Sequence, residues 1–139
     1  MDRRMSVLFL CTGNSARSIM AEAIANGRYG DRLTARSAGS HPRSEVWPLA
    51  LETLRRHGVP TESLRSKSFN EVAGETFDLV VTVCDRARAE PCPTFPGAPS
   101  RAHWSLPDPP EASEPADAFE SVFQALDDSL GRLAAGHGV

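Results

Sequence analysis

The strongest constraint on the fold is an alternation between short apolar runs and segments with helical periodicity. Residues 6–11 form a continuous apolar run, and directly after it apolar side chains recur at helical spacing, at Ile19, Met20, Ala23 and Ile24. A run that is apolar on both faces is typical of a strand in a parallel sheet that is covered on both sides. The pattern predicts an α/β fold: a three-layer open sandwich with a mainly parallel sheet of about four strands and helices on both faces.

The remaining elements continue this alternation along the chain. They are a weak strand, a helix, a strongly apolar strand, a short strand and an amphipathic helix, predicted over residues 34–38, 46–54, 77–83, 102–106 and 119–133. The strongly apolar strand is rich in β-branched side chains and belongs in the centre of the sheet. Ligands of such sheets bind at the carboxyl ends of the strands, where Cys11 and Cys84 both fall. We therefore expect these two cysteines at one edge of the sheet.

Composition favours one folded domain over residues 1–139. Hydrophobic residues make up 40% of the chain and charged residues 24%, which is close to the average of soluble globular proteins. Fifteen basic and eighteen acidic side chains give a formal net charge of −3, and neither sign forms a long run. This balance argues against a surface that binds nucleic acid or an anionic membrane.

The N-terminal residues and the cysteine content bear on where the protein works. The apolar residues 7–10 are too few for a signal peptide, and no stretch approaches the roughly 18 apolar residues that span a bilayer. We therefore expect a cytoplasmic protein, in which thiols stay reduced. In that compartment the odd set of Cys11, Cys84 and Cys92 indicates chemistry rather than a structural disulfide.

The segment from Cys11 to Ser18 joins the first strand to the first helix and has the spacing Cys-x5-Arg. A loop that leads into a helix N-terminus directs several backbone N–H groups at one point, and the helix dipole adds to the attraction for an anion. Gly13 and Asn14 tolerate the left-handed backbone that such a loop needs, and the guanidinium of Arg17 offers a planar fork of donors. We expect an oxyanion to bind the whole segment, formed by Thr12, Gly13, Asn14, Ser15, Ala16, Arg17 and Ser18.

The thiol of Cys11 is the candidate nucleophile of this loop. The loop amides, Arg17 and the Ser18 hydroxyl are expected to stabilise its thiolate and to lower its pKa. The alternative is that Cys11 only ends a buried strand and that Arg17 is a surface residue. Spacing alone does not decide between the two, because fourteen of the 139 residues are Arg and a chance Cys-x5-Arg arises easily.

The octapeptide CTGNSARS resembles the phosphate loop of the low-molecular-weight protein tyrosine phosphatases and of the arsenate reductases that share their fold. Four further motifs, which together extend the likeness over roughly residues 7–109, resemble the arsenate reductase branch: VTVCD at 81–85, EPCP at 90–93, HW at 103–104 and LPDP at 106–109. The resemblance implies that Cys11 is the nucleophile and that residues 12–18 bind the oxyanion. It also implies that Asp108 is the general acid and that Cys84 and Cys92 form a redox pair.

The two later cysteines suit the reduction of an oxyanion. Hydrolysis of a phosphate ester needs one thiolate and an acid, whereas reduction of As(V) needs two electrons, which a thiol pair supplies on becoming a disulfide. We expect Cys11 to attack arsenic while Asp108 protonates a departing oxygen. Cys84 then attacks the Cys11 sulfur and releases arsenite, and Cys92 attacks Cys84 and carries the disulfide to the surface. An external thiol system, thioredoxin or glutathione with glutaredoxin, resets the enzyme; no tightly bound cofactor is expected, and phosphate and sulfate should compete with arsenate.

Several alternatives stay open at this stage. Cys84 is also explained as a small core residue, and Asp108 as an ordinary turn residue between two prolines. Cys84, Cys92 and His103 have the side chains of a zinc site, but the sequence offers no Cys-x2-Cys pair and no fourth ligand at a typical spacing. At the level of function, the alternatives are a low-molecular-weight protein tyrosine phosphatase and a non-catalytic oxyanion or redox sensor.

Three positions depart from the patterns of these relatives. Residue 16 is Ala where many have a second cysteine, so a disulfide within the loop cannot protect Cys11. The phosphatases usually place an aromatic residue soon after the Asp-Pro, whereas residues 110–112 are Pro-Glu-Ala, which weakens the phosphatase interpretation. Some arsenate reductases hold a structural potassium ion. Three of its ligands are matched and the carboxylate expected near Phe69 is not, so we predict no metal ion; the matching residues are Asn14, Glu22 and Ser37.

Overall fold

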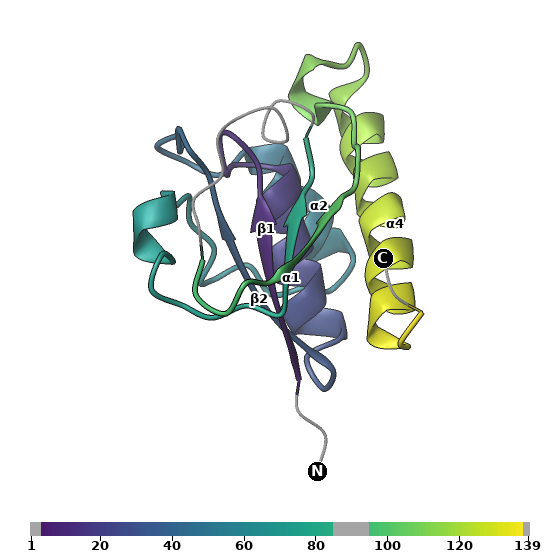
Figure 1. Ribbon diagram of the computed structural model, residues 1–139. Helices are drawn as coiled ribbons and strands as arrows, with labels where there is room; N and C mark the ends of the chain where they lie inside the picture. Colours follow the sequence, from purple (N-terminus) through teal and green to yellow (C-terminus); the bar gives the residue numbers. More distant parts are fainter. Residues whose placement is uncertain (1–3, 85–94, 138–139) are drawn as a thin grey trace.

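The computed structural model of the protein describes residues 4–84 and 95–137, and a four-stranded sheet lies at its centre (Figure 1). The strand order is β2-β1-β3-β4, and every neighbouring pair is parallel. This arrangement confirms the predicted parallel sheet and the inner position of its most apolar strand. The strands are β1 (Met5–Leu10), β2 (Leu33–Ala38), β3 (Leu79–Thr82) and β4 (Ser100–His103).

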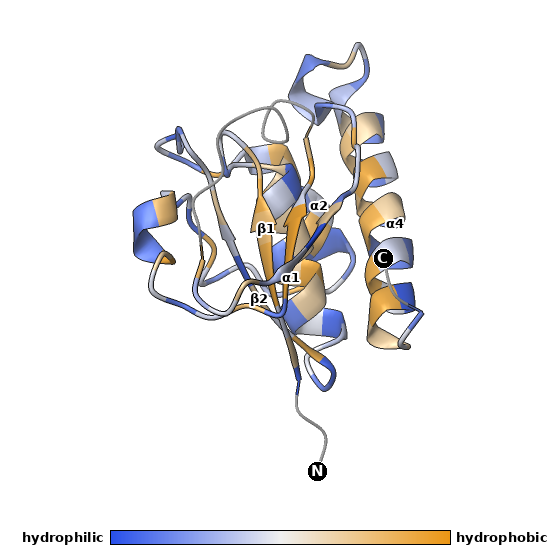
Figure 2. Ribbon diagram, viewed as in Figure 1, coloured by the Kyte–Doolittle hydropathy of each residue, from blue (hydrophilic) through white to orange (hydrophobic). Residues whose placement is uncertain are grey.

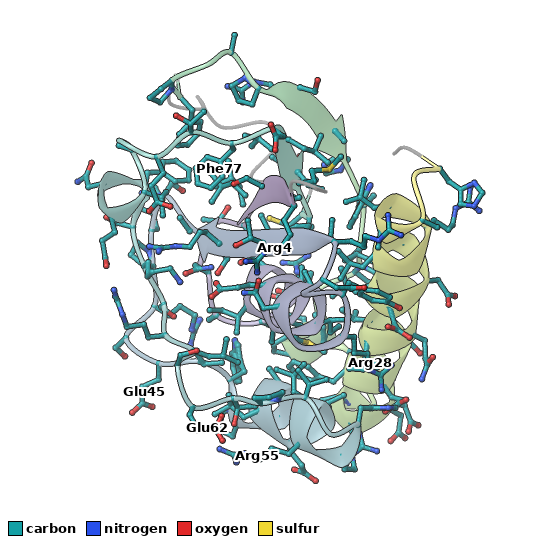
Figure 3. All side chains as sticks on the ribbon, turned by 90° about the horizontal axis from the view of Figure 1, so that it is seen from below. Arg4, Arg28, Glu45, Arg55, Glu62 and Phe77 are labelled. Atoms are coloured by element: carbon teal, nitrogen blue, oxygen red, sulfur yellow. The ribbon has the colours of Figure 1, made fainter. Side chains whose placement is uncertain are left out.

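Three α-helices pack together on one face of the sheet: α1 (Arg17–Arg28), α2 (Pro48–Arg56) and α4 (Pro115–Ala134). Figure 3 shows them grouped on one side of the sheet. Side chains of a strand alternate between its two faces, so Val7 and Phe9 of β1 and Val81 of β3 meet these helices in one core. The predicted amphipathic helix is confirmed, because α4 turns six apolar side chains inward: Phe119, Val122, Phe123, Leu126, Leu130 and Leu133.

The opposite face of the sheet has its own, smaller core. Leu8 and Leu10 point to this face and pack with Phe77 and Phe95, whose rings meet edge to face at 5.8 Å. The label of Phe77 in Figure 3 lies on the side of the sheet away from the three α-helices. The short 3-10 helix η1 (Phe69–Glu71) and neighbouring loop residues cover this face within the described ranges. The predicted three layers are confirmed; among the described residues, the α-helices lie on one face, and the only helical segment on the other face is the 3-10 helix η1.

The hydropathy of the chain follows this layering. Figure 2 shows hydrophobic residues concentrated in the central strands, while the peripheral loops are mostly hydrophilic. This explains why the apolar runs of β1 and β3 are readable in the sequence: both strands are covered on two faces and bordered by two neighbours. Within residues 4–84 and 95–137, no helix is long and apolar enough to cross a membrane.

The short strand predicted over residues 102–106 is wrong in its position. β4 runs from Ser100 to His103, two residues earlier at its start and three at its end. It is an edge strand, its first two residues are exposed, and it therefore lacks an apolar signature. Leu106, which gave the expected strand its apolar end, lies in a loop whose backbone contacts the functional site.

Candidate active site

The carboxyl ends of β1 and β3 bring Cys11 and Cys84 into contact. Leu10 pairs with Thr82 in the parallel register, so the residues that follow the two strands lie side by side. The Sγ atoms of Cys11 and Cys84 are 2.9 Å apart, and both side chains are buried. The prediction that these two thiols meet at one edge of the sheet is confirmed.

Residues 11–16 curl between β1 and α1 as a tight loop. Asn14 adopts the left-handed conformation, with φ of 44°, and its backbone N–H donates to the carbonyl of Cys11 at 3.2 Å. The Asn14 side chain donates to the Ser18 hydroxyl at 2.8 Å and accepts from the backbone N–H of Lys67 at 2.7 Å. The left-handed conformation costs energy in a residue other than glycine, and these hydrogen bonds hold Asn14 in it.

A second segment fixes the carbonyl groups of the loop. The backbone N–H groups of His41 and Arg43 donate to Thr12 and Gly13, and that of Trp47 donates to Ser15, each at 2.9 Å. Because a trans peptide points its carbonyl and the following N–H in opposite directions, the N–H groups after these carbonyls face the other side of the loop. The carbonyl groups of the loop thus point toward residues 41–47, and the N–H groups that follow them point to the opposite side. An oxyanion site requires N–H groups that point toward the anion.

The loop forms the floor of a pocket of about 860 Å³. Cys11 and Cys84 lie in its lining, as do two cationic side chains, Arg17 and Arg43. The walls are residues 41–47 on one side and residues 106–111 on the other. The guanidinium of Arg43 lies over the Trp47 ring, 4.8 Å from its centroid, which holds this cation at the rim of the pocket.

Arg17 ties the segment of Asp108 to the loop. One terminal nitrogen donates to the carbonyl of Leu106 at 2.8 Å, and the other lies 3.4 Å from the Asp108 carboxylate. The Nε of Arg17 is buried and has no hydrogen-bond partner among the described residues. A buried guanidinium donor without a partner calls for an acceptor, and a bound oxyanion would supply one.

The prediction that the loop lowers the pKa of Cys11 is wrong for this arrangement. The hydrogen bond with Cys84 and burial raise the pKa of the Cys11 thiol above its ordinary value. The charge of Arg17 and the backbone N–H of Gly13 act in the opposite direction but are outweighed. Two sulfur atoms in contact disfavour a second negative charge, so the two thiols titrate as a coupled pair. The expectation from the sequence considered the effect of the loop on the pKa of Cys11 but not the effect of Cys84.

Sequence reasoning missed a buried ion pair beneath the loop. The Nζ of Lys67 lies 3.3 Å from Oε1 of Glu22, and the hydroxyl of Ser37 donates to the same oxygen. The residues that match potassium ligands therefore do not fit a potassium ion, because the ammonium group already faces the carboxylate that such an ion would need. The one available signal was that Lys67 is the only lysine of the chain.

Two of the predicted groups lie outside the described residues: Cys92, and Asp85, which follows Cys84 directly. Among the residues that the structure describes, no three His, Cys, Asp or Glu side chains gather into a metal site. His103 hydrogen-bonds through Nδ1 to the Thr82 hydroxyl at 2.7 Å, at the carboxyl end of β3. The structure thus brings together Cys11, Cys84, Arg17 and Asp108 at one pocket.

Comparison with known proteins identifies the family. The family described as low molecular weight phosphotyrosine protein phosphatase matches residues 6–137 of this chain. The chain belongs to this family. An arsenate reductase of Halalkalibacterium halodurans is 34% identical over 126 residues, which cover 91% of this chain and 89% of that protein. The predicted resemblance to the arsenate reductases of this phosphatase fold is confirmed, and the chain is an enzyme of that group.

Solved structures agree with this family. The thioredoxin-dependent arsenate reductase of Corynebacterium glutamicum superposes with a TM-score of 0.73 and 28% identity, covering 96% of this chain and 61% of that longer chain. A low molecular weight protein tyrosine phosphatase from T. tengcongensis superposes with a TM-score of 0.79 and 24% identity, covering 95% of this chain and 99% of that chain. At that identity the second likeness shows the shared fold alone.

Proposed function

We propose that this protein reduces arsenate to arsenite, with Cys11 as the nucleophile and with Cys84 and Cys92 as the pair that ends as a disulfide. The single observation that carries the proposal is the 2.9 Å contact between the Cys11 and Cys84 sulfur atoms on the floor of the pocket. A disulfide bond is about 2.05 Å long, so only a small shift of these sulfur atoms is needed for one to form when As(V) accepts two electrons. A phosphatase, the alternative function, needs no second thiol at its nucleophile.

Binding of arsenate would use the loop of residues 12–18, in which the backbone N–H of Asn14 already donates to the Cys11 carbonyl, and the guanidinium of Arg17. The unpartnered Nε of Arg17 supports this role, because the other two nitrogens of the same group already contact Leu106 and Asp108. Phosphate and sulfate have the same tetrahedral shape and charge range, so they would compete for the loop. The proton of the Cys11 thiol would pass to an arsenate oxygen as the arsenic–sulfur bond forms.

The proposed reaction proceeds in three steps. The Cys11 sulfur bonds to arsenic, and one oxygen leaves as water after Asp108 supplies a proton. Cys84 then attacks the Cys11 sulfur; the electron pair of the arsenic–sulfur bond passes to arsenic, which leaves as As(III) in arsenite. Cys92 finally attacks Cys84, so that Cys11 returns as a thiolate and the disulfide joins Cys84 and Cys92.

An external dithiol would reduce this disulfide and complete the cycle. A thioredoxin is the first candidate, because the relative from Corynebacterium glutamicum is described as thioredoxin-dependent. Glutathione with glutaredoxin is the other candidate. We further propose that residues 1–139 act as one catalytic domain and that the protein works in the cytoplasm, where such thiol systems keep cysteines reduced.

Arsenate-dependent oxidation of NADPH tests the proposal. Purified protein is combined with thioredoxin and its reductase, or with glutathione, glutaredoxin and glutathione reductase, and NADPH loss is followed with and without arsenate. We expect turnover with one system and none in the Cys11→Ser control, because an alcohol is a far poorer nucleophile at neutral pH. Rapid hydrolysis of phosphotyrosine together with no arsenate-dependent oxidation would instead establish the phosphatase function.

Peptide mapping after a single arsenate pulse separates catalysis from mere sensing. The wild-type protein is treated without an external reductant, alkylated and digested. We expect one arsenite released per protein and a disulfide between Cys84 and Cys92. Bound arsenate with all three cysteines still reduced would point to an oxyanion-binding module without turnover.

A further inference from the structure

Lys67 is the only lysine among fifteen basic residues, and its side chain is buried. The side chains of Lys67 and Glu22 are 6% and 11% exposed, and their charged groups lie 3.3 Å apart. The ammonium group also donates to the backbone carbonyl of Arg65 at 3.2 Å. A charge pair this far from water is stable only while both partners are present.

The Lys67–Glu22 pair connects the elements that shape the oxyanion loop. Glu22 lies on α1 and accepts the hydroxyl hydrogen of Ser37, which lies on β2. The backbone of Lys67 donates to the Asn14 side chain at 2.7 Å and accepts from Gly39 at 2.9 Å. Residue 67 thus holds α1 through its ammonium group, and it holds the left-handed Asn14 and the end of β2 through its backbone.

The chemistry around Lys67 suits a compact cation. The ammonium group contacts two oxygens, that of a backbone carbonyl and that of the Glu22 carboxylate, and this carboxylate oxygen also accepts the Ser37 hydroxyl hydrogen. An ammonium is a small, nearly spherical charge, whereas the planar fork of an arginine needs a wider, flat site. In a chain with fourteen arginines, the single lysine occupies this buried position.

We propose that the Lys67 ammonium acts as a built-in monovalent cation and as a positioning residue for oxyanion binding. It neutralises Glu22 and thereby holds Ser37, Asn14 and the loop in the conformation that binds the anion. Without it, the buried Glu22 carboxylate is uncompensated and a small external cation becomes necessary in its place. The inference rests on the proposed function in one respect: oxyanion binding is one of the two properties that its test measures, and thermal stability is the other.

The test compares three side chains at position 67 in salts whose cations differ in size. Phosphate is titrated calorimetrically into wild type, Lys67→Ala and Lys67→Met, in choline, potassium or ammonium chloride at equal ionic strength, with thermal unfolding measured in the same salts. Wild type should bind phosphate equally in all three. Lys67→Ala should bind about tenfold more weakly in choline and recover in potassium or ammonium, which fit the space left by the side chain.

Two controls make the result specific to the cation site. Lys67→Met fills the space without a charge, so it should bind weakly in every salt and gain nothing from ammonium. Arg65→Met removes a neighbouring exposed cation, whose side chain is 61% exposed and paired with Glu71, and should leave phosphate binding unchanged. Recovery of Lys67→Ala but not of Lys67→Met is a result that simple structural damage would not produce.

Other results would overturn the proposal. They are phosphate binding by Lys67→Ala as tight as wild type in choline, an equal loss in all salts, and failure of the variant to fold in every salt. Tighter phosphate binding by wild type in potassium than in choline would also contradict it, because the lysine would then not replace the external cation. If wild type binds no phosphate, the proposed function is wrong, while the unfolding temperatures of Lys67→Ala in choline and ammonium still decide the role of Lys67.

Discussion

At the scale of single residues, the chemistry depends on neighbours that are distant in sequence. Cys11 and its partner Cys84 are 73 positions apart, and the two members of the Lys67–Glu22 pair are 45 apart. The sequence predicted the first pair because both cysteines follow apolar strands. It could not predict the second, because a buried charge leaves no periodic pattern and potassium-like ligands alone do not reveal an ammonium among them.

Replacing Cys84 with alanine should lower the pKa of Cys11. The hydrogen bond with Cys84 is the largest of the causes that raise this pKa, whereas Arg17 and the Gly13 N–H, which lower it, remain. More Cys11 is then thiolate at neutral pH, so its alkylation by iodoacetamide should become faster and its rate profile should move to lower pH. The measurement is the alkylation rate of Cys11 against pH by peptide mass, with Cys92→Ser as the control. If the pH dependence of alkylation is the same as in wild type, burial rather than Cys84 raises the pKa of Cys11.

Replacing Asp108 with asparagine should impair the chemical step and spare binding. The asparagine oxygen can still accept from Arg17, which lies 3.4 Å from the carboxylate, but the side chain no longer supplies a proton. We expect arsenate turnover to fall by ~10²–10⁴ while the phosphate dissociation constant stays near that of wild type. The measurements are kcat and calorimetric binding. Full turnover, with chemistry shown to limit the rate, would transfer the acid role to another group such as Asp85.

At the scale of elements, apolar strands were predictable and polar ones were not. β1 and β3 are covered on both faces, so their apolar runs identify them, whereas β4 at the edge has exposed residues and was misplaced by two to three positions. The contact between Gly39, at the end of β2, and the oxyanion loop also has no signature in one sequence. A Cβ built on Gly39 would lie 2.4 Å from the carbonyl oxygen of Cys11 and 2.5 Å from that of Thr12.

Replacing Gly39 with alanine should therefore damage both stability and oxyanion binding. The two atoms that the methyl group meets belong to the backbone of the loop, so relief requires the loop itself to move. We expect a loss of about 1–3 kcal/mol in the free energy of unfolding, measured in urea, together with weaker phosphate binding. Gly74→Ala is the matched control, since a Cβ there has nothing within 4 Å and should change neither quantity. Wild-type phosphate affinity in Gly39→Ala would show that the loop tolerates the shift.

At the scale of the whole molecule, the parallel sheet determines where chemistry can occur. The carboxyl ends of β1 and β3 supply the two thiols, α1 supplies Arg17, and the segment after β4 supplies Asp108, all at one edge. This convergence was predictable, because parallel strands end at the same edge of a sheet. The raised pKa of Cys11 was not predictable, since it depends on a 2.9 Å contact that only packing determines.

The order of the cysteines in the proposed relay is testable by stopping it at successive steps. Cys84→Ser leaves Cys11 able to attack arsenate but without the thiol that resolves the adduct, so turnover with the physiological reductant should collapse and no disulfide should form. Cys92→Ser should stop one step later, with a disulfide between Cys11 and Cys84 after one arsenate pulse, which peptide mapping detects. Hydrolysis of a small aryl phosphate serves as the control and should survive both changes, because water, not a thiol, resolves a cysteinyl phosphate. Full arsenate turnover in either variant would exclude that cysteine from the relay, and in Cys84→Ser it would also leave the sulfur contact at Cys11 without a catalytic role.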